Sequence, residues 1–140
     1  MIHQNLTRQH KELYKLLSDM KHLRYNIESN ADKIALNINL LAGKINIHLQ
    51  SEDKYLYSLL LNSDNPEVRK IAKIFITEMG HISKTFNDFK LKFNTKNKIL
   101  NNINEFNLEY SKIIDAISNR LNKEDKNLYI LLNTKKDTHL

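Results

Sequence analysis

The sequence predicts an all-α fold, an up-down-up-down antiparallel four-helix bundle built from two helical hairpins related by a pseudo-twofold repeat. Its 140 residues include only two glycines and one proline, so the chain has few places to turn. Apolar residues recur at spacings of three and four, which is typical of amphipathic helices and not of strands. A ten-residue segment also occurs twice in similar form, which indicates two equivalent halves.

The first hairpin is predicted from two apolar stripes. Residues 4–28 form the first helix, with the stripe Leu6, His10, Leu13, Leu17 and Met20. Ser29 or Asn30 is expected to end this helix and to cap the next one. The second helix, residues 31–62, carries the stripe Leu41, Ile45, His48, Glu52, Leu56 and Leu59. Pro66 suits the first position of the following helix and therefore limits the second.

The second hairpin follows the same pattern. Residues 66–93 form a helix with the stripe Ile71, Ile74, Phe75, Ile82, Phe86, Phe89 and Phe93. Asn94 and Thr95 interrupt it and provide a cap. Residues 96–133 form the last helix, with the stripe Ile103, Phe106, Tyr110, Ile113, Ile117, Leu121, Leu128 and Leu131. Short loops require neighbouring helices to run antiparallel. Residues 1–133 are thus expected to form one bundle, followed by a polar C-terminal tail over 134–140.

The internal repeat links the second and fourth predicted helices. The segment from Ser51 to Leu60 recurs from Lys123 to Leu132 with seven of ten positions identical, at an offset of 72 residues. The same offset relates Leu41 to Ile113. Helices 31–62 and 96–133 are therefore expected to occupy equivalent places in the two hairpins.

Composition excludes several classes of protein. The absence of cysteine excludes disulfides, a thiolate zinc site and a cysteine nucleophile. No apolar run is long enough to span a membrane, and the first residues lack the apolar core of a signal peptide, so we expect a cytoplasmic protein. The net charge of +6 is spread over 18 lysines without an aromatic and basic cluster, so neither nucleic acid nor membrane is an expected partner. Because no nucleophile and base pair is evident, the sequence favours binding over catalysis.

Polar side chains stand on the apolar stripes where a core would require apolar ones. His48 and Glu52 are four residues apart, so one helical turn places both on one face, where they can reach a single ion. His10 lies on the first stripe, and His81 lies beside Ile82 at nearly the same level of the bundle. Histidine and glutamate from several helices at one depth are typical of a non-haem iron or manganese site.

Over nearly the whole chain, the sequence resembles the hemerythrin-like family of HHE cation-binding domains. The matching residues are His10, then His48 and Glu52 in HLQSEDKYLY, His81 in EMGHISK and Glu124 in RLNKEDKNLY. The resemblance implies that these five side chains are metal ligands. It also implies two irons bridged by glutamates, and a role in carrying or sensing oxygen, responding to nitric oxide or handling iron.

One position departs from the family pattern. Arg120, aligned with His48 through the repeat, stands where the family has its fourth-helix histidine. Arginine stays protonated and has no lone pair for a metal. We therefore expect a guanidinium paired with Glu52 or Glu124, and an incomplete site with one metal ion or none in place of two.

Two functions remain open at this point. The first is an iron-binding domain that senses or handles oxygen, nitric oxide or iron, with a diatomic gas and an unidentified protein as partners. The second is a metal-free helical interaction module in which Arg120 and the glutamates form a buried ionic cluster. A ferritin-like di-metal site is less favoured because its Glu-x-x-His motif occurs once, at Glu78 and His81, where two copies are needed.

Three further residues receive structural roles. Tyr57 and Tyr129 occupy equivalent positions in the repeat and are expected to pack against the core with their hydroxyls at the surface. Asp125 follows Glu124 and should point about 100° away from it in an α-helix, so we expect an exposed carboxylate outside the ligand set.

Overall fold

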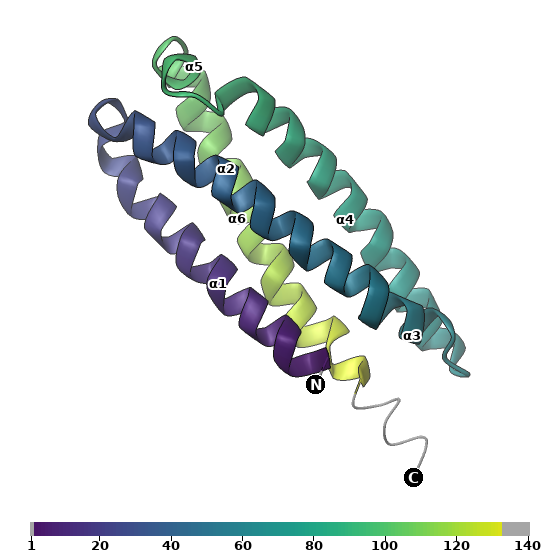
Figure 1. Ribbon diagram of the computed structural model, residues 1–140. Helices are drawn as coiled ribbons and strands as arrows, with labels where there is room; N and C mark the ends of the chain where they lie inside the picture. Colours follow the sequence, from purple (N-terminus) through teal and green to yellow (C-terminus); the bar gives the residue numbers. More distant parts are fainter. Residues whose placement is uncertain (1, 133–140) are drawn as a thin grey trace.

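The computed structural model describes residues 2–132, and its regular elements there are helices without a strand. In chain order they are α1 (Ile2–Leu23), the 3₁₀ turn η1 (Arg24–Asn26), α2 (Ile27–Ser51), the π-helix η2 (Glu52–Tyr57), α3 (Ser58–Leu61), α4 (Pro66–Phe93), α5 (Lys96–Leu100), α6 (Ile103–Lys123) and the π-helix η3 (Glu124–Leu128). The long helices α1, α2, α4 and α6 lie side by side as a bundle (Figure 1). The all-helical prediction is confirmed, whereas the tail predicted at 134–140 lies outside the described residues.

Helix boundaries follow from capping side chains. Asn65 precedes α4, and its side-chain oxygen accepts a hydrogen bond from the Glu67 amide at 2.9 Å, with Pro66 in the first turn as predicted. The Thr95 hydroxyl oxygen accepts from the Lys98 amide at 3.3 Å and begins α5. These two starts agree with the sequence interpretation.

Two other boundaries differ from it. The cap between the first two helices is Asn26 and not residue 29 or 30, because the chain turns through η1 and the Asn26 side chain accepts from the Ser29 amide at 3.2 Å. The predicted helix 96–133 is also broken. The backbone of Asn102 leaves the helical region, with φ −147°, and separates α5 from α6.

The two π-helices occupy equivalent places in the internal repeat. Each begins at a glutamate of the repeat, Glu52 in η2 and Glu124 in η3. In η3 the Tyr129 amide donates to the Glu124 carbonyl at 2.8 Å, five residues back. Residues five apart point about 140° away from each other around an α-helix. A turn closed by this longer bond brings them toward one face instead.

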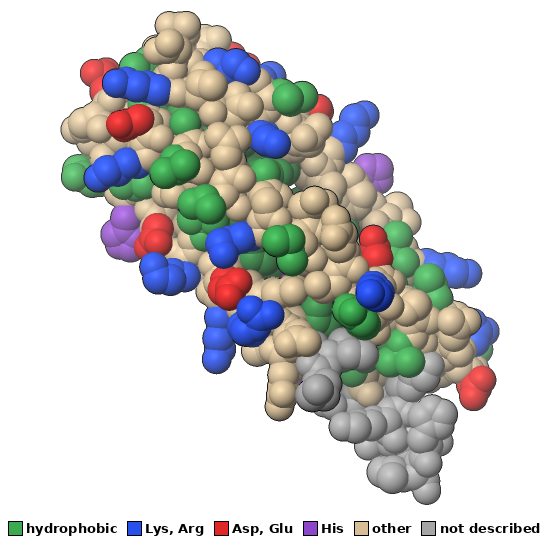
Figure 2. All heavy atoms as spheres, in the orientation of Figure 1, with side chains coloured by type: hydrophobic (Ala, Val, Ile, Leu, Met, Phe, Trp, Pro, Cys, Tyr) green, Lys and Arg blue, Asp and Glu red, His purple; other side chains and the backbone are tan. Residues whose placement is uncertain are grey.

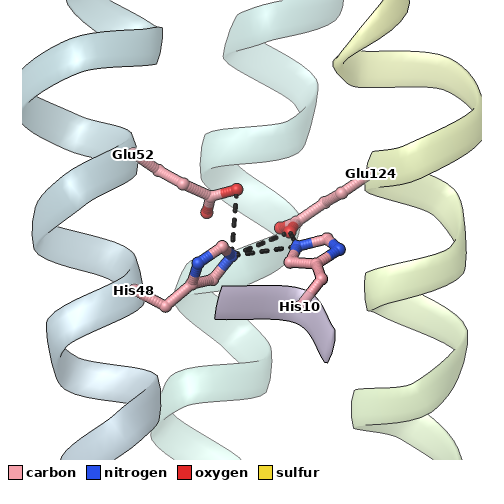
Figure 3. A group of neighbouring side chains, drawn as sticks. All are labelled: His10, His48, Glu52 and Glu124. Atoms are coloured by element: carbon pink, nitrogen blue, oxygen red, sulfur yellow. Dashed lines mark hydrogen bonds and ion pairs between the residues drawn. The ribbon is translucent and has the colours of Figure 1, made fainter. Parts of the chain in front are cut away.

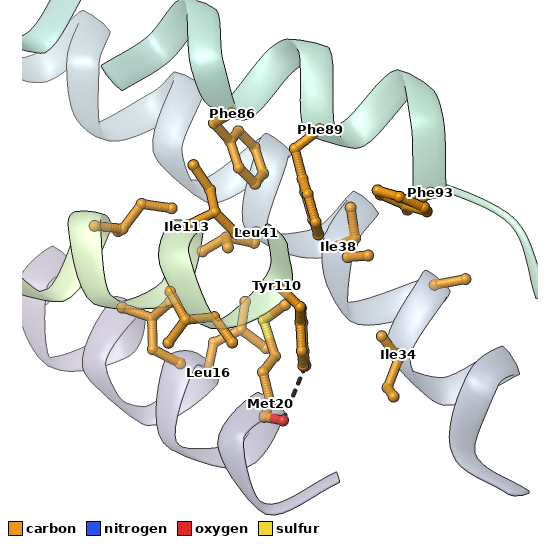
Figure 4. Close-up of a cluster of buried hydrophobic side chains, with 14 of the residues drawn as sticks. Leu16, Met20, Ile34, Ile38, Leu41, Phe86, Phe89, Phe93, Tyr110 and Ile113 are labelled. Atoms are coloured by element: carbon orange, nitrogen blue, oxygen red, sulfur yellow. Dashed lines mark hydrogen bonds between the residues drawn. The ribbon is translucent and has the colours of Figure 1, made fainter. Parts of the chain in front are cut away.

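The core consists of two apolar clusters with a polar layer between them. The larger cluster contains a group of packed rings that includes Phe89, Phe93 and Tyr110 (Figure 4). The ring of Phe106 stacks against those of Phe89 and Tyr110. In this group the Tyr110 hydroxyl donates to the Met20 carbonyl at 2.9 Å. The smaller cluster, which includes Leu6, Leu56, Leu60, Val68, Ala72, Phe75, Leu128 and Leu131, lies on the other side of the layer. The buried polar residues of the layer are His10, His48, Glu52, Arg120 and Glu124.

The buried face of α4 differs in part from the predicted stripe. Its buried residues are Val68, Ala72, Phe75, Phe86, Phe89 and Phe93, with Met79 and Ile82 partly buried between them. Ile74, which was assigned to the stripe, is exposed. The core positions follow steps of three and four from Ala72, and Ile74 falls outside these steps.

On the face drawn in Figure 2, lysine and arginine side chains stand apart from one another among acidic, polar and apolar groups. Within the described residues, no helix combines the length and apolar character that crossing a membrane requires.

Truncation of the ring cluster tests the larger core. Phe106 is fully buried, and its ring centroid lies 4.7 Å from that of Tyr110 and 5.0 Å from that of Phe93. We expect Phe106→Ala to lower the free energy of unfolding by about 3 to 5 kcal/mol, measured by urea unfolding followed by circular dichroism. Leu108→Ala is the control on the same helix, because Leu108 is 66% exposed, and should stay within about 0.5 kcal/mol of the parent. Equal losses in the two variants would contradict this account of the core.

Candidate metal centre

Four buried side chains bring their ligand atoms together in the polar layer (Figure 3). They are His10 from α1, His48 from α2, Glu52 from the start of η2 and Glu124 from the start of η3. One ligand atom of each lies within 4.8 Å of those of the others. The Nε2 atoms of His10 and His48 are 3.1 Å apart, and Oε1 of Glu124 lies 2.9 Å from the first and 3.2 Å from the second.

Contacts outside the group orient both imidazoles. Nδ1 of His48 donates to the Gln9 side-chain oxygen at 2.7 Å, and Gln9 in turn donates to the Ser51 hydroxyl at 3.0 Å. Nδ1 of His10 lies 2.9 Å from Oδ1 of Asp125, at ion-pair distance although outside hydrogen-bonding geometry. A proton held at Nδ1 leaves the lone pair on Nε2, which points into the group.

The chemistry of these atoms fits a metal ion. Two imidazole Nε2 atoms face each other at contact distance, and each is an acceptor when Nδ1 carries the proton. Oε1 of Glu52 is buried without a hydrogen-bond partner among the described residues. An Nε2 atom without a proton is here a buried acceptor beside carboxylate oxygens, and a cation satisfies such acceptors together. Nitrogen and oxygen donors without sulfur suit iron, manganese or zinc.

The electrostatics of the group also favour a positive charge. Burial opposes protonation of His48, but hydrogen bonds to Glu124 and Glu52 outweigh it and raise the pKa of His48 to about 9. Burial raises the pKa of Glu52. Burial acts in the same direction on Glu124, but hydrogen bonds from His10 and His48 prevail and hold the pKa of Glu124 well below its usual range. The lowered pKa of Glu124 and the raised pKa of His48 both show that this part of the layer favours a positive charge beside Glu124.

Arg120 completes the polar layer beside the four-residue group. Its Nε donates to Oε2 of Glu124 at 2.9 Å, so the expected partner is Glu124 and not Glu52. Nη2 donates to the Tyr57 hydroxyl at 3.2 Å and to the Phe75 carbonyl at 2.8 Å. The guanidinium carbon also lies 4.5 Å from the centre of the Phe75 ring. Glu124 thus offers one carboxylate oxygen to the histidines and the other to Arg120.

His81 lies outside this group. The structure unites four of the five predicted ligands, but His81 on α4 is exposed. The core-facing positions nearby are Met79 and Ile82, so position 81 points away from the bundle axis. At the level of Arg120, α4 presents the Phe75 carbonyl and ring instead. The expectation that His81 converges with the other histidines was wrong, because adjacency to Ile82 in the sequence does not place both side chains on one face.

Sequence reasoning missed the part played by two tyrosines. The hydroxyls of Tyr57 and Tyr129 are not at the surface, since both residues are buried and both hydroxyls point into the polar layer. The expectation rested on the amphipathic character of tyrosine and took no account of η2 and η3, which change the helical phase after each repeat glutamate. The signal in the sequence was the spacing, because each tyrosine stands five residues after a repeat glutamate.

Asp125 does more than the exposed carboxylate that the sequence predicts. Its carboxylate is partly exposed, as expected, and stays outside the four-residue group. It nevertheless lies against Nδ1 of His10, and its Oδ2 accepts from the Tyr14 hydroxyl at 3.0 Å. Asp125 therefore supports His10 from outside the group.

A bundle with a buried cluster of histidine and carboxylate ligands defines a class, the helical metal-binding proteins. The chain belongs to the hemerythrin family, because a family model described as the hemerythrin HHE cation binding domain matches residues 1–132. No curated protein and no solved structure matches the chain. Family membership and the buried group together indicate a cation-binding domain.

Removal of the guanidinium tests the charge balance of the layer. In Arg120→Met, Oε2 of Glu124 loses its buried positive partner, so we expect the free energy of unfolding to fall by about 3 to 5 kcal/mol. The measurement is urea unfolding with a chelator present throughout. Lys123→Met, which removes a half-exposed cation paired with Glu78, should cost about 1 kcal/mol or less. A similarly small loss in Arg120→Met would show that Glu124 does not depend on the guanidinium.

Proposed function

We propose that the chain binds a single non-haem iron ion through His10, His48, Glu52 and Glu124, and that it senses or handles iron, oxygen or nitric oxide. The observation that carries the proposal is the convergence of these four ligand atoms within 4.8 Å in a buried layer. When bound, iron would supply a redox-active centre able to take a diatomic gas as a ligand.

The position of Arg120 supports one ion in place of two. In the resemblance described above, glutamates bridge a pair of irons. Here Glu124 bridges the histidine pair and a guanidinium, with Oε1 2.9 Å from His10 Nε2 and Oε2 2.9 Å from Arg120 Nε. The guanidinium of Arg120 thus places a fixed positive charge on the side of Glu124 away from the histidines. A guanidinium has no lone pair to offer a metal.

The second candidate is a metal-free helical interaction module. One observation favours it: the contacts of Arg120 with Glu124, Tyr57 and Phe75 satisfy the guanidinium without any ion. In this case the polar layer would contribute only structural specificity to a surface used by a protein partner. Metal content separates the two candidates.

Metal content is the central prediction. We expect one iron per chain after anaerobic reconstitution with ferrous iron, measured by plasma mass spectrometry on untagged protein. Glu52→Gln should lose most of this iron, because the substitution removes a ligand charge while preserving the shape of the side chain. Glu105→Gln is the control, since Glu105 is an exposed carboxylate paired with Lys92 outside the four-residue group, and it should retain the iron.

Other stoichiometries lead to different conclusions. Two irons per chain would show that Arg120 does not limit the site. No iron, even after reconstitution, would favour the metal-free module.

The support of His48 by Gln9 provides a further prediction. Gln9→Ala removes the acceptor that holds the Nδ1 proton of His48, so we expect iron affinity to fall about 10- to 100-fold. Competition with a chromophoric chelator measures this change. Gln50→Ala, at an exposed position of α2, should leave the affinity unchanged. An unchanged affinity in Gln9→Ala would mean that the outer contact does not orient the ligand.

A further inference from the structure

A fifth oxygen atom stands among the four candidate ligands. The Tyr129 hydroxyl oxygen lies 2.7 Å from His10 Nε2 and 3.3 Å from His48 Nε2. It donates to Oε2 of Glu52 at 2.9 Å and also lies 3.3 Å from Oε1 of Glu124. Tyr129 is 1% exposed, so its hydroxyl faces the group and not the solvent. One hydroxyl donates a single hydrogen bond and accepts at most two, so it cannot hydrogen-bond to all four neighbours at once.

The π-helical backbone of η3 determines the direction in which this hydroxyl points. The Tyr129 amide donates to the Glu124 carbonyl across the turn that ends η3, which brings residues five apart toward one face. In an uninterrupted α-helix, Tyr129 would point about 140° away from Glu124. The π-helix therefore places a second oxygen side chain from the same helix beside the imidazoles.

The repeat supplies a contrasting position. Tyr57 follows Glu52 as Tyr129 follows Glu124, and it is buried to a similar degree. Its hydroxyl, however, accepts from Nη2 of Arg120 at 3.2 Å and belongs to the guanidinium side of the layer. The two equivalent tyrosines thus face different groups: Tyr57 contacts the guanidinium, whereas Tyr129 contacts all four candidate ligands.

We propose that Tyr129 is a fifth protein ligand of the metal ion and that its phenolate oxygen makes this a site for ferric iron. The inference rests on the proposed function, since it concerns the same ion. On binding, the iron–oxygen bond replaces the O–H bond, and the phenol proton is released to the solvent. Burial first, and the two carboxylates after it, favour the neutral phenol, and a bound cation reverses that preference.

The donor set explains the preference for the trivalent ion. With Tyr129 the ion meets three anionic oxygens and two neutral nitrogens. Arg120 already contributes one buried positive charge beside Glu124. A ferric ion held by the glutamates alone would leave a large excess of buried positive charge, which a low-dielectric interior penalises. The third anionic oxygen reduces this excess, and phenolate is a hard donor that favours ferric iron over divalent metals.

The experiment loads the full chain with ferric nitrilotriacetate and records its visible and resonance Raman spectra. We expect a phenolate-to-iron charge-transfer band with tyrosine ring modes in the parent protein. Tyr129→Phe should lose the band. Tyr57→Phe, the matched control, should keep it. Circular dichroism checks that each variant is folded, and zinc titration checks that the four remaining ligands of Tyr129→Phe still bind a metal.

The outcomes separate this inference from the function on which it rests. Loss of the band in Tyr129→Phe alone, with zinc binding retained, supports the fifth ligand. A band that survives in Tyr129→Phe, or iron-loaded parent protein without any band, overturns it while leaving the iron site in place. A parent protein that takes up neither ferric iron nor zinc overturns the proposed function itself.

Discussion

The shared carboxylate of Glu124 is the interaction on which the polar layer depends. One oxygen contacts the two imidazoles, and the other accepts from Arg120, so a single buried group couples α1, α2 and α6. A charge at this depth is tolerated only because it has positive or hydrogen-bonding partners on both sides. The same arrangement divides the layer into two halves. One half contains the candidate metal-ligand atoms, and in the other half the guanidinium of Arg120 balances the charge of Glu124.

The apolar clusters on either side keep this layer dry. Helix α1 passes from one cluster to the other, with Leu6 and Leu13 on either side of His10, and the chain does the same where α2 continues into η2 and α6 into η3. Exclusion of water strengthens the electrostatic interactions within the layer and raises the cost of any unpaired group. Within residues 2–132, Oε1 of Glu52 has no hydrogen-bond partner, and this buried acceptor connects the packing of the bundle to cation binding.

Much of the fold and part of the site follow from local patterns. The stripes at three- and four-residue spacing and the capping residues predicted the long helices, and Pro66 marked the start of α4. The repeat aligned Arg120 with His48, and this alignment predicted an arginine where the family pattern has a histidine. His81 shows the limit of this reasoning. Its neighbour Ile82 turns toward the core while His81 is exposed, because a helix rotates by about 100° at each residue.

The sequence by itself determined the helical class, the internal duplication and the identity of the histidine, glutamate and arginine residues of the layer, because periodicity and residue chemistry are local properties. Only the tertiary structure decided which atoms meet. The π-helices at Glu52 and Glu124 change the helical phase, and no spacing rule for an α-helix anticipates them. Tyr129 consequently faces the ligands, and Arg120 selects Glu124 over Glu52, since both choices depend on contacts between helices that are far apart in the chain.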